Sequence, residues 1–373
     1  MKRYLLRYIV LALLLGVLVW MVLDEDRIFS DQENRNLAQF PEISVESVFT
    51  GEFMSEFETY LADQFPVRDA CIKIKTAALR VSGQKLIGDY YLANDNYLIQ
   101  KDSPCDWEQV DEMLGLINKM SKEYENVNVS FMLAPTAMSI YEDKLPYTAE
   151  TTQLETMDEI ESKLDDSVNY IDIYDAIYEK RAMGMYYKTD HHWTSRAAYV
   201  AFGCYADSLG ISYSDSDYSF MAVTNEFQGT CASGSGIYEA MDLIEICVPN
   251  NSEGTYVVNY VESMKKNASL FDSSKLEIKD KYQVFMGGNH SQVDITTNAK
   301  TGRNLLLIKD SYGNCMVPIL TSHFDKIIVV DPRYFCGDIY EVMATYRINE
   351  VLFMYNVNSF VTDNSLDVML AKE

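Results

Sequence analysis

Histidine is scarce in this chain, with only four in 373 residues. Two of them are adjacent, at His191 and His192, and the other two are His290 and His323. Imidazole is the side chain that most often serves as a general base near neutral pH. A base for acid–base chemistry therefore has to be sought at very few positions.

Basic residues are also few, since 31 lysines and arginines face 56 aspartates and glutamates and the formal net charge is -25. No basic block occurs beyond the extreme N-terminus. Phosphate binding needs a stripe of lysine and arginine, so nucleic acid is excluded as a partner. An acidic polymer would likewise need a local basic pocket. We interpret the acidic charge as mainly keeping an exposed protein soluble.

The seven cysteines form no Cys-x-x-Cys pair and no zinc-ligand spacing. Their odd number in so long a chain argues against a disulfide framework. Three lie in apolar segments, at Cys204, Cys247 and Cys315, where cysteine behaves as a small buried hydrophobic residue. We therefore interpret the cysteines as structural.

A single long apolar run, residues 8–23, stands near the N-terminus. Lys2, Arg3 and Arg7 precede it, and the acidic residues 24–26 follow. Sixteen apolar residues reach roughly 24 Å as a helix, and residues 4–6 extend this to about 30 Å, the thickness of a bilayer core. No small-x-small cleavage site follows, which favours an uncleaved anchor over a signal peptide. Positive flanks stay inside, so the sequence predicts a single-pass membrane protein whose catalytic part lies outside the cytoplasm.

The remainder of the chain is typical of a packed globular protein, with 48% hydrophobic and 12% aromatic residues. We predict a stub and anchor over 1–27, a tether with a helical segment over 28–85, and a catalytic domain over 86–373. Residues 213–298 are irregular and read as an insertion or a strand-rich flap. In the helical segment, residues 63–69 predict a corner between two helices, and we expect Arg68 to hold this corner in place.

Helices and strands alternate along the predicted catalytic domain. A strand pair over 90–100 turns at 94–96, and a strand over 127–135 ends in a proline turn. Three further apolar, β-rich runs follow at 305–308, 326–330 and 351–355. This alternation predicts an α/β fold with a parallel sheet flanked by helices. Ligands bind beyond the C-terminal ends of such strands, so Ala134, Pro135 and Thr136 are candidates for the edge of a pocket.

Residues 188–194 read Lys-Thr-Asp-His-His-Trp-Thr. An aspartate two residues before a histidine can hold the imidazole in one tautomer and steady its charged form. Thr194 is a good N-cap for a helix that continues to Ala206. A narrow apolar stripe along that helix predicts packing on the sheet. The two histidines would then lie in a loop that the helix holds in place.

Ser311 is the candidate nucleophile, because it follows the apolar strand at 305–308 and precedes a predicted helix. Backbone N–H groups at a helix start can hold a developing oxyanion. Serine needs a base, and His290 and His323 have no acid two residues before them. Adjacent side chains in an extended segment point to opposite sides, so only one of the pair is expected to face the serine. We predict His192 with Asp190, and the alternative for Ser311 is an N-cap without a catalytic role.

The stretches Asp190–Thr194 and Leu306–Tyr312 resemble those of the DHHW protein family. This family is similar to the SGNH-hydrolase-like domains of alginate O-acetylation proteins. Further matching stretches span most of the predicted outer part, at 33–37, 63–68 and 331–335. The sequence shows no obvious C-terminal carbohydrate-binding module.

The resemblance implies a Ser-His-Asp triad of Ser311, His192 and Asp190, with His191 as a neighbour or second base. It implies transfer of acetyl groups to a surface polysaccharide, with a membrane-bound O-acyltransferase as the partner that passes acyl groups outward. No cofactor is expected. The SGNH pattern adds oxyanion or substrate contacts, for which the candidates are Gly288, Asn289, Asn314 and Arg333. An asparagine beside glycine can equally form a turn, and Arg333 can equally form a structural salt bridge.

Three alternatives remain at this point. The same triad would act as a carbohydrate esterase if water replaced the sugar hydroxyl. The chain could also be a non-catalytic, polysaccharide-binding scaffold of an export complex. Asp190, His191 and His192 are similar to the motif of Asp-His-His phosphoesterases, but no upstream Asp-x-Asp motif stands in a matching context, so no metal is predicted.

Overall fold

The computed structural model describes residues 2–30, 32–33, 35–146, 149–250 and 256–371. Asn34, which belongs to the matching stretch at 33–37, lies outside the described residues. The chain divides into two compact units. Unit 1 comprises Met1–Gly88 and Ser233–Ile237, and unit 2 comprises Asp89–Ala232 and Tyr238–Glu373.

Unit 1 is mainly helical, with the short strands β1 (Phe29–Ser30) and β2 (Arg35–Asn36) paired antiparallel. Its helices are α1 (Lys2–Leu23), α2 (Val45–Thr50), α3 (Glu52–Asp63) and α4 (Arg68–Val81). Helix α1 confirms that the apolar N-terminal run is helical. In the described part of the chain, however, no helix is long and apolar enough to cross a membrane.

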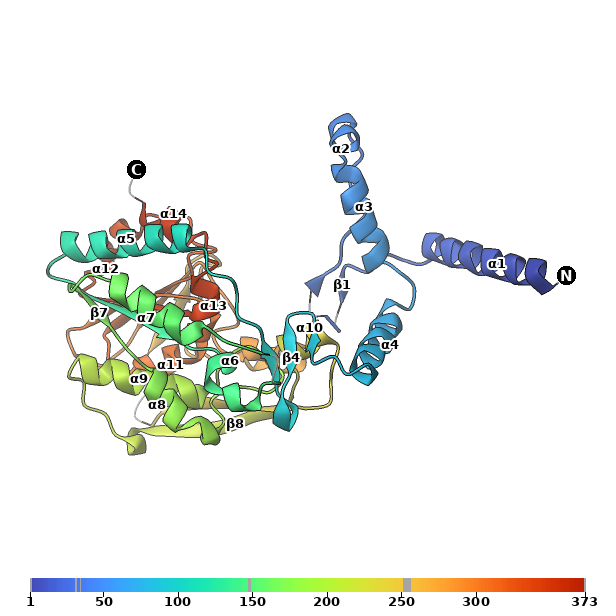
Figure 1. Ribbon diagram of the computed structural model, residues 1–373. Coiled ribbons are helices and arrows are strands. Elements are labelled where there is room, and N and C mark those ends of the chain that lie inside the picture. The colour runs from blue at the N-terminus through green and yellow to red at the C-terminus, as the bar shows by residue number, and fades with distance from the viewer. Residues whose placement is uncertain (1, 31, 34, 147–148, 251–255, 372–373) are drawn as a thin grey trace. The chain divides into compact units, whose positions relative to one another are not determined.

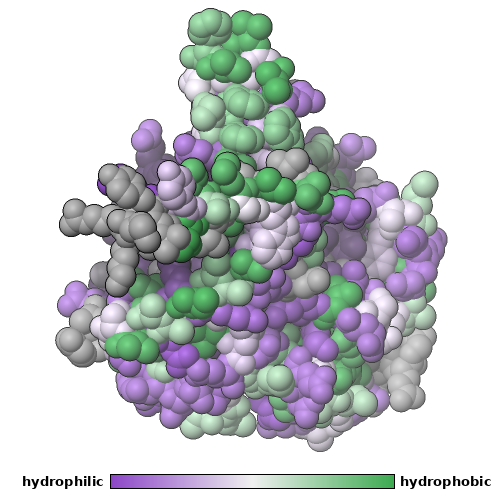
Figure 2. All heavy atoms as spheres, turned by 90° about the vertical axis from the view of Figure 1, so that its right-hand side faces the viewer, coloured by the Kyte–Doolittle hydropathy of each residue, from purple (hydrophilic) through white to green (hydrophobic). Residues whose placement is uncertain are grey.

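The corner between α3 and α4 holds a network of charges. Asp63, whose side chain is 4% exposed, accepts hydrogen bonds from both Arg35 amino groups and from the Ala38 N–H. Arg68 pairs with Glu33 and donates from Nε to the Ala62 carbonyl. The structural interpretation of this segment is confirmed. Hydrophobic side chains remain exposed on α2, among them Val45, Val48 and Phe49 (Figure 2).

Unit 2 is built on an eight-stranded sheet of order β11-β10-β12-β14-β13-β15-β6-β7. The strands on one side of the sheet are parallel: β14 (Lys326–Val330), β13 (Asn304–Lys309), β15 (Glu350–Asn356), β6 (Asn128–Ala134) and β7 (Val168–Tyr170). The others pair antiparallel: β12 (Gln292–Thr296) with β14, β10 (Val257–Tyr260) with β12, and β11 (Lys265–Asn267) with β10.

The α/β class and the flanking helices are confirmed, and the predicted parallel sheet is part of a larger, mixed sheet. Strands from the irregular region 213–298 extend the sheet at its β14 edge. The connection from β10 to β11 is short, as antiparallel neighbours allow, whereas residues 261–291 separate β10 from β12 and residues 297–325 separate β12 from β14. The same region also supplies an antiparallel pair of its own, β8 (Tyr218–Phe227) with β9 (Asp242–Pro249).

Helices cover both faces of the parallel strands (Figure 1). Alternate residues of β13 point to opposite faces, so Leu305 and Leu307 belong to one core and Leu306 and Ile308 to the other. The first core is covered by α6 (Ala137–Ile140), α8 (Tyr174–Glu179), α9 (Ser195–Ser208) and α11 (Val317–Leu320). The second is covered by α5 (Trp107–Glu123), α7 (Gln153–Lys163), α12 (Ile339–Tyr346), α13 (Val357–Phe360) and α14 (Leu366–Leu370).

Local predictions agree with the structure in two places. Strands β4 (Tyr90–Leu92) and β5 (Leu98–Gln100) pair antiparallel around the turn η1 (Asn94–Asn96). Helix α9 has Thr194 at its N-cap and buries the predicted narrow apolar stripe. The Thr194 hydroxyl does not cap the helix, because it donates to the Gly184 carbonyl at 2.9 Å.

Candidate active site

The motif at 188–194 forms a short loop that the chain closes on itself. Tyr186 and Trp193 face each other in an antiparallel bridge, and the Thr194 N–H donates to the Met185 carbonyl at 2.8 Å. The Asp242 carboxylate accepts from the backbone N–H groups of Lys188 and Thr189, both at 2.8 Å. These bonds fix the backbone on both sides of the residues at 190–192.

Asp190, His192 and Ser311 form one chain of hydrogen bonds, although the serine lies 119 residues after the histidine. His192 Nδ1 is 2.5 Å from Asp190 Oδ1, and His192 Nε2 is 2.7 Å from Ser311 Oγ. The geometry is that of a nucleophile, a base and an acid that orients the base. The structure thus brings the three predicted residues together.

Asp190 is 2% exposed and is surrounded by donors. Oδ2 accepts from the N–H of Thr230 at 2.8 Å and from its hydroxyl at 3.1 Å, and Oδ1 accepts from the His192 N–H at 3.0 Å. Burial alone would raise the pKa of this carboxyl, but the neighbouring histidines and these hydrogen bonds outweigh it and hold the pKa far below its usual range. Asp190 is therefore an anion.

His191 packs against His192 instead of pointing away from it. The ring centroids are 3.9 Å apart, which corrects the expectation that adjacent side chains lie on opposite sides. The loop is turned here and not extended, and the Tyr312 hydroxyl donates to the His191 carbonyl. His191 Nδ1 is 2.5 Å from the Thr230 hydroxyl. Of the two histidines, His192 is the one that is hydrogen-bonded to Ser311. Burial, then the charge of His192, lowers the pKa of His191 to about 4.

Ser311 begins the short helix η7 (Ser311–Cys315) directly after β13. The N-cap is Asp310 and not Ser311, because the Asp310 carboxylate accepts from the Tyr312 N–H at 2.8 Å. The capping alternative for Ser311 is therefore wrong, and its hydroxyl is left to contact His192. Tyr282 stacks on His192 with centroids 3.8 Å apart, and its hydroxyl donates to the Ser311 carbonyl at 3.3 Å.

Trp193 is completely buried, and its Nε1–H donates to the Tyr312 carbonyl at 2.9 Å. This bond connects the loop that contains His192 to the helix that begins at Ser311. Trp193 is thus a packing anchor, as predicted, and has no surface to offer a substrate.

The candidate oxyanion contacts are only partly brought together. Asn314 lies in η7, and its amide donates to Asn289 Oδ1 at 2.9 Å. The Gly288 N–H donates to the Phe285 carbonyl at 3.2 Å and is therefore engaged, which corrects its assignment as a free donor. Gly288 has a φ of 115°, which favours glycine over other residues. The backbone turn therefore explains why a glycine is found at this position.

Arg333 forms a salt bridge with buried Asp331, through Nε at 2.8 Å and Nη2 at 2.6 Å. Lys309, also buried, lies 3.5 Å from the same carboxylate. Burial lowers the pKa of Lys309, while Asp331 opposes that shift. The structural interpretation of Arg333 is thus supported, although its side chain remains 39% exposed.

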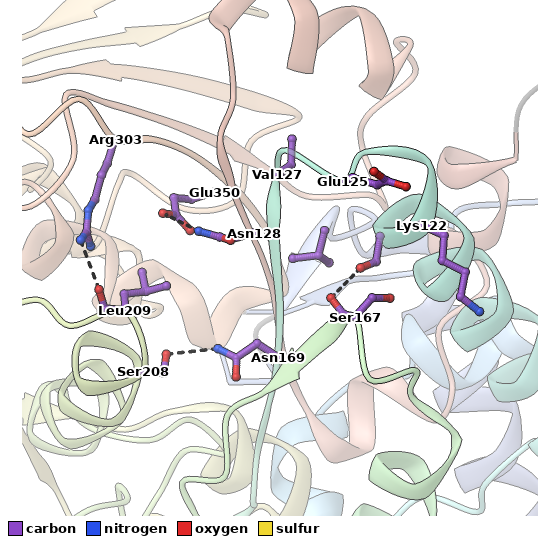
Figure 3. A pocket seen from close by; sticks show the side chains of 12 residues that line it. Lys122, Glu125, Val127, Asn128, Ser167, Asn169, Ser208, Leu209, Arg303 and Glu350 are labelled. Atoms are coloured by element: carbon purple, nitrogen blue, oxygen red, sulfur yellow. Dashed lines mark hydrogen bonds between the residues drawn. The ribbon is translucent and has the colours of Figure 1, made fainter.

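Thr136, Asp190, His191 and Tyr312 line a cavity of about 10 Å³, which has room for roughly one water. The strand end predicted as a pocket edge therefore does lie beside the motif. A much larger cavity, of about 690 Å³, lies at the opposite end of the strands, where β6 and β15 begin. Figure 3 shows Asn128, Asn169, Arg303 and Glu350 around it.

Asp190, His191 and His192 also offer ligand atoms within 4.8 Å of one another, a spacing that a metal ion could use. Both ring nitrogens of His192 already have partners, Asp190 and Ser311. A metal on this histidine would have to break one of those two bonds.

Three contact residues were missed by sequence reasoning: Gly229, Thr230 and Tyr282. They come from the irregular region 213–298, far from the motif. A Cβ on Gly229 would lie 2.1 Å from Asp190 Oδ2, so only glycine fits there. The glycine itself was a visible turn signal, but nothing local indicated what the turn would approach. No sequence signal marked Tyr282.

Comparison with known proteins adds the following. Residues 73–330 match the model of the family described as DHHW protein. A crystal structure of a DHHW family protein from Eubacterium siraeum is similar, with 26% identity, a TM-score of 0.64, and coverage of 74% of this chain and 94% of that one. Bacillus cereus PatB1 with a sulfonyl adduct has 21% identity, a TM-score of 0.64, and coverage of 75% and 99%.

The O-acetyltransferase domain of Pseudomonas putida AlgJ is a more distant match, with 12% identity, a TM-score of 0.49, and coverage of 75% and 94%. No curated protein matches the sequence. The family match covers well over half of the chain and includes Asp190–Trp193 and Ser311. This chain is therefore a member of the DHHW protein family.

Proposed function

We propose that this protein is an O-acetyltransferase that moves acetyl groups onto a polysaccharide through an acyl-serine intermediate. The observation that carries the proposal is the chain of hydrogen bonds from Asp190 through His192 to Ser311. The resemblance of the family to alginate O-acetylation proteins supports the choice of acetyl group and polysaccharide. Action outside the cytoplasm stays a prediction from the sequence.

In the first half of the reaction, Ser311 Oγ attacks the acetyl carbonyl of the donor while His192 Nε2 takes the hydroxyl proton. The bond from the acyl carbon to the donor breaks, and the leaving group receives that proton. Anionic Asp190 stabilises the imidazolium in between. A membrane-bound O-acyltransferase is the proposed donor partner, since acetyl-CoA does not reach an outer site.

In the second half, an acceptor hydroxyl gives its proton to His192 Nε2 and attacks the acetyl-serine. The ester bond to Ser311 breaks, and His192 returns the proton to Ser311 Oγ. Water in place of the sugar hydroxyl would give hydrolysis by the same steps. The outcome therefore depends on how the site binds the acceptor.

The test uses the whole chain of 373 residues with 4-nitrophenyl acetate and a mixture of oligosaccharides. We expect acetylated Ser311 by mass spectrometry and acceptors heavier by one acetyl group. Ser311→Ala and His192→Ala should abolish both, and a chelator should change neither. Acetate release without acceptor acetylation would indicate an esterase. Glycan binding without acetyl-serine would indicate a scaffold, and inhibition by the chelator would indicate a metal site.

A further inference from the structure

His191 has one ring nitrogen whose role the triad does not explain. Its Nδ1 is bonded to the Thr230 hydroxyl, and no described residue is a partner of its Nε2. Nε2 is not among the buried side-chain atoms without a partner, and the side chain is 29% exposed. This nitrogen therefore reaches the surface beside the triad.

The direction of the hydrogen bonds determines what this nitrogen offers. Asp190 is an anion, so it can only accept, and the single hydroxyl proton of Thr230 is donated to its Oδ2 at 3.1 Å. In its hydrogen bond with His191, the Thr230 oxygen must therefore be the acceptor. The donor is His191 Nδ1, so this nitrogen carries the proton. A neutral imidazole carries one N–H only, so Nε2 presents a lone pair.

The ring is kept neutral by its surroundings. Burial, the charge of His192 and, least, that of Arg333 together lower the pKa of His191 to about 4, although Asp190 opposes the shift. Near neutral pH, His191 is thus a permanent acceptor and cannot donate from Nε2. His192, in contrast, changes between base and acid during each half-reaction.

We infer that His191 Nε2 accepts a hydrogen bond from a hydroxyl adjacent to the one that is acetylated, so that the site selects acceptors with two neighbouring hydroxyl groups. The two rings pack with centroids 3.9 Å apart, and their Nδ1 atoms lie 4.0 and 2.5 Å from Asp190 Oδ1, so both Nε2 atoms are on the ring edges away from that carboxylate oxygen. A vicinal diol of a sugar can meet both at once. Water or a simple alcohol cannot, because each has a single oxygen.

This inference rests on the proposed function and names the acceptor class of the same site. It also gives a reason for the presence of two adjacent histidines, His191 and His192. A lone base would activate water and sugar alike, whereas a second, neutral acceptor favours a polyhydroxyl substrate over water. In this view Thr230 is a positioning residue that sets the tautomer of His191 and holds Asp190.

The experiment compares cis-1,2-cyclohexanediol with cyclohexanol as acceptors for acetyl transfer from 4-nitrophenyl acetate. For the wild type we expect the diol to be acetylated roughly tenfold faster, the upper range for one neutral hydrogen bond. His191→Phe keeps a flat ring against His192 but has no acceptor. It should still form acetylated Ser311, and its preference for the diol should fall to the statistical ratio set by two hydroxyl groups against one.

His191→Gln is the matched control, because its side-chain oxygen can replace the Nε2 acceptor and should restore part of the preference. Equal diol preference in wild type and His191→Phe would overturn the inference while leaving the proposed function intact. Loss of acetylated Ser311 in His191→Phe would also overturn it, by assigning His191 to the first half-reaction. Absence of acetylated Ser311 in the wild type would refute the proposed function and the inference with it.

Discussion

Asp190 shows how much a single charge can contribute at the scale of one residue. The carboxylate is buried, accepts four hydrogen bonds and contacts the base. In the proposed reaction Asp190 stabilises the imidazolium and holds His192 Nε2 toward Ser311. An amide of the same shape would lose the charge and could donate where an acceptor is required.

Asp190→Asn is therefore expected to slow acetylation of Ser311 by about 10³- to 10⁴-fold while the fold remains intact. The rate of nitrophenolate release checks this, with circular dichroism as the control for folding. A loss of less than tenfold would contradict the role assigned to Asp190.

His191 makes a prediction about pH. Its folded pKa of about 4 lies below the ordinary value of 6.5, so between these values the unfolded chain binds a proton that the folded chain does not. Stability is thus complete above pH 6.5 and falls as the pH is lowered toward 4, by at most about 3 kcal/mol.

His191→Gln removes this titration. The difference in free energy of unfolding between wild type and variant should therefore shrink, or reverse, as the pH falls from 7 to 4. Denaturant titrations at a series of pH values measure this difference in free energy of unfolding. The carboxyl groups are the same in both proteins, so their effects cancel in the difference. A constant difference across that range would show that the folded pKa of His191 is not lowered.

At the scale of elements, the turn after β8 matters as much as the motif itself. Gly229 brings the backbone against Asp190, and Thr230 then donates twice to it. Tyr282, in η6 (Lys281–Val284), covers the other side of the base. Elements from the irregular region thus complete a site whose reacting groups lie elsewhere.

Gly229→Ala should displace Asp190, because the added Cβ would lie 2.1 to 2.5 Å from its carboxyl group. We expect the rate of Ser311 acetylation to fall by about 10²-fold, as for a misplacement of an ångström. Gly115→Ala is the matched control: this glycine is exposed on α5 with nothing within 4 Å. It should leave the rate unchanged and stabilise the protein by up to about 1 kcal/mol. Equal rates in both variants would contradict the prediction.

At the scale of the whole molecule, the chain has two compact units, and the triad lies entirely in unit 2. Unit 1 has its own stabilising network, in which buried Asp63 holds Arg35. A defect in that network should affect unit 1 without changing the chemistry.

Asp63→Ala is expected to destabilise unit 1 by about 2 kcal/mol, the range for hydrogen bonds to a charged group. Hydrogen exchange should accelerate in α3 and α4, while β13 and β15 stay protected and Ser311 acetylation proceeds at the wild-type rate. Faster exchange in the central sheet would show instead that the two units unfold together.

Much of this molecule could be read from short stretches of sequence. The apolar runs of β13, β14 and β15, the turn at 94–96 and the stripe of α9 depend on neighbours a few residues away, so periodicity predicts them. The types of residue at Asp190, His192 and Ser311 likewise limited the chemistry, because so few histidines were present.

What only the tertiary structure decided is the set of contacts between distant parts of the chain. The antiparallel strands β10 to β12, the packing of His191 against His192, and the approach of Thr230 and Tyr282 all depend on the path of the chain between them. Local propensity carries no information about that path, since it is determined by burial of the two cores as a whole. The sequence by itself thus determined which groups can react, and the fold decided that they meet.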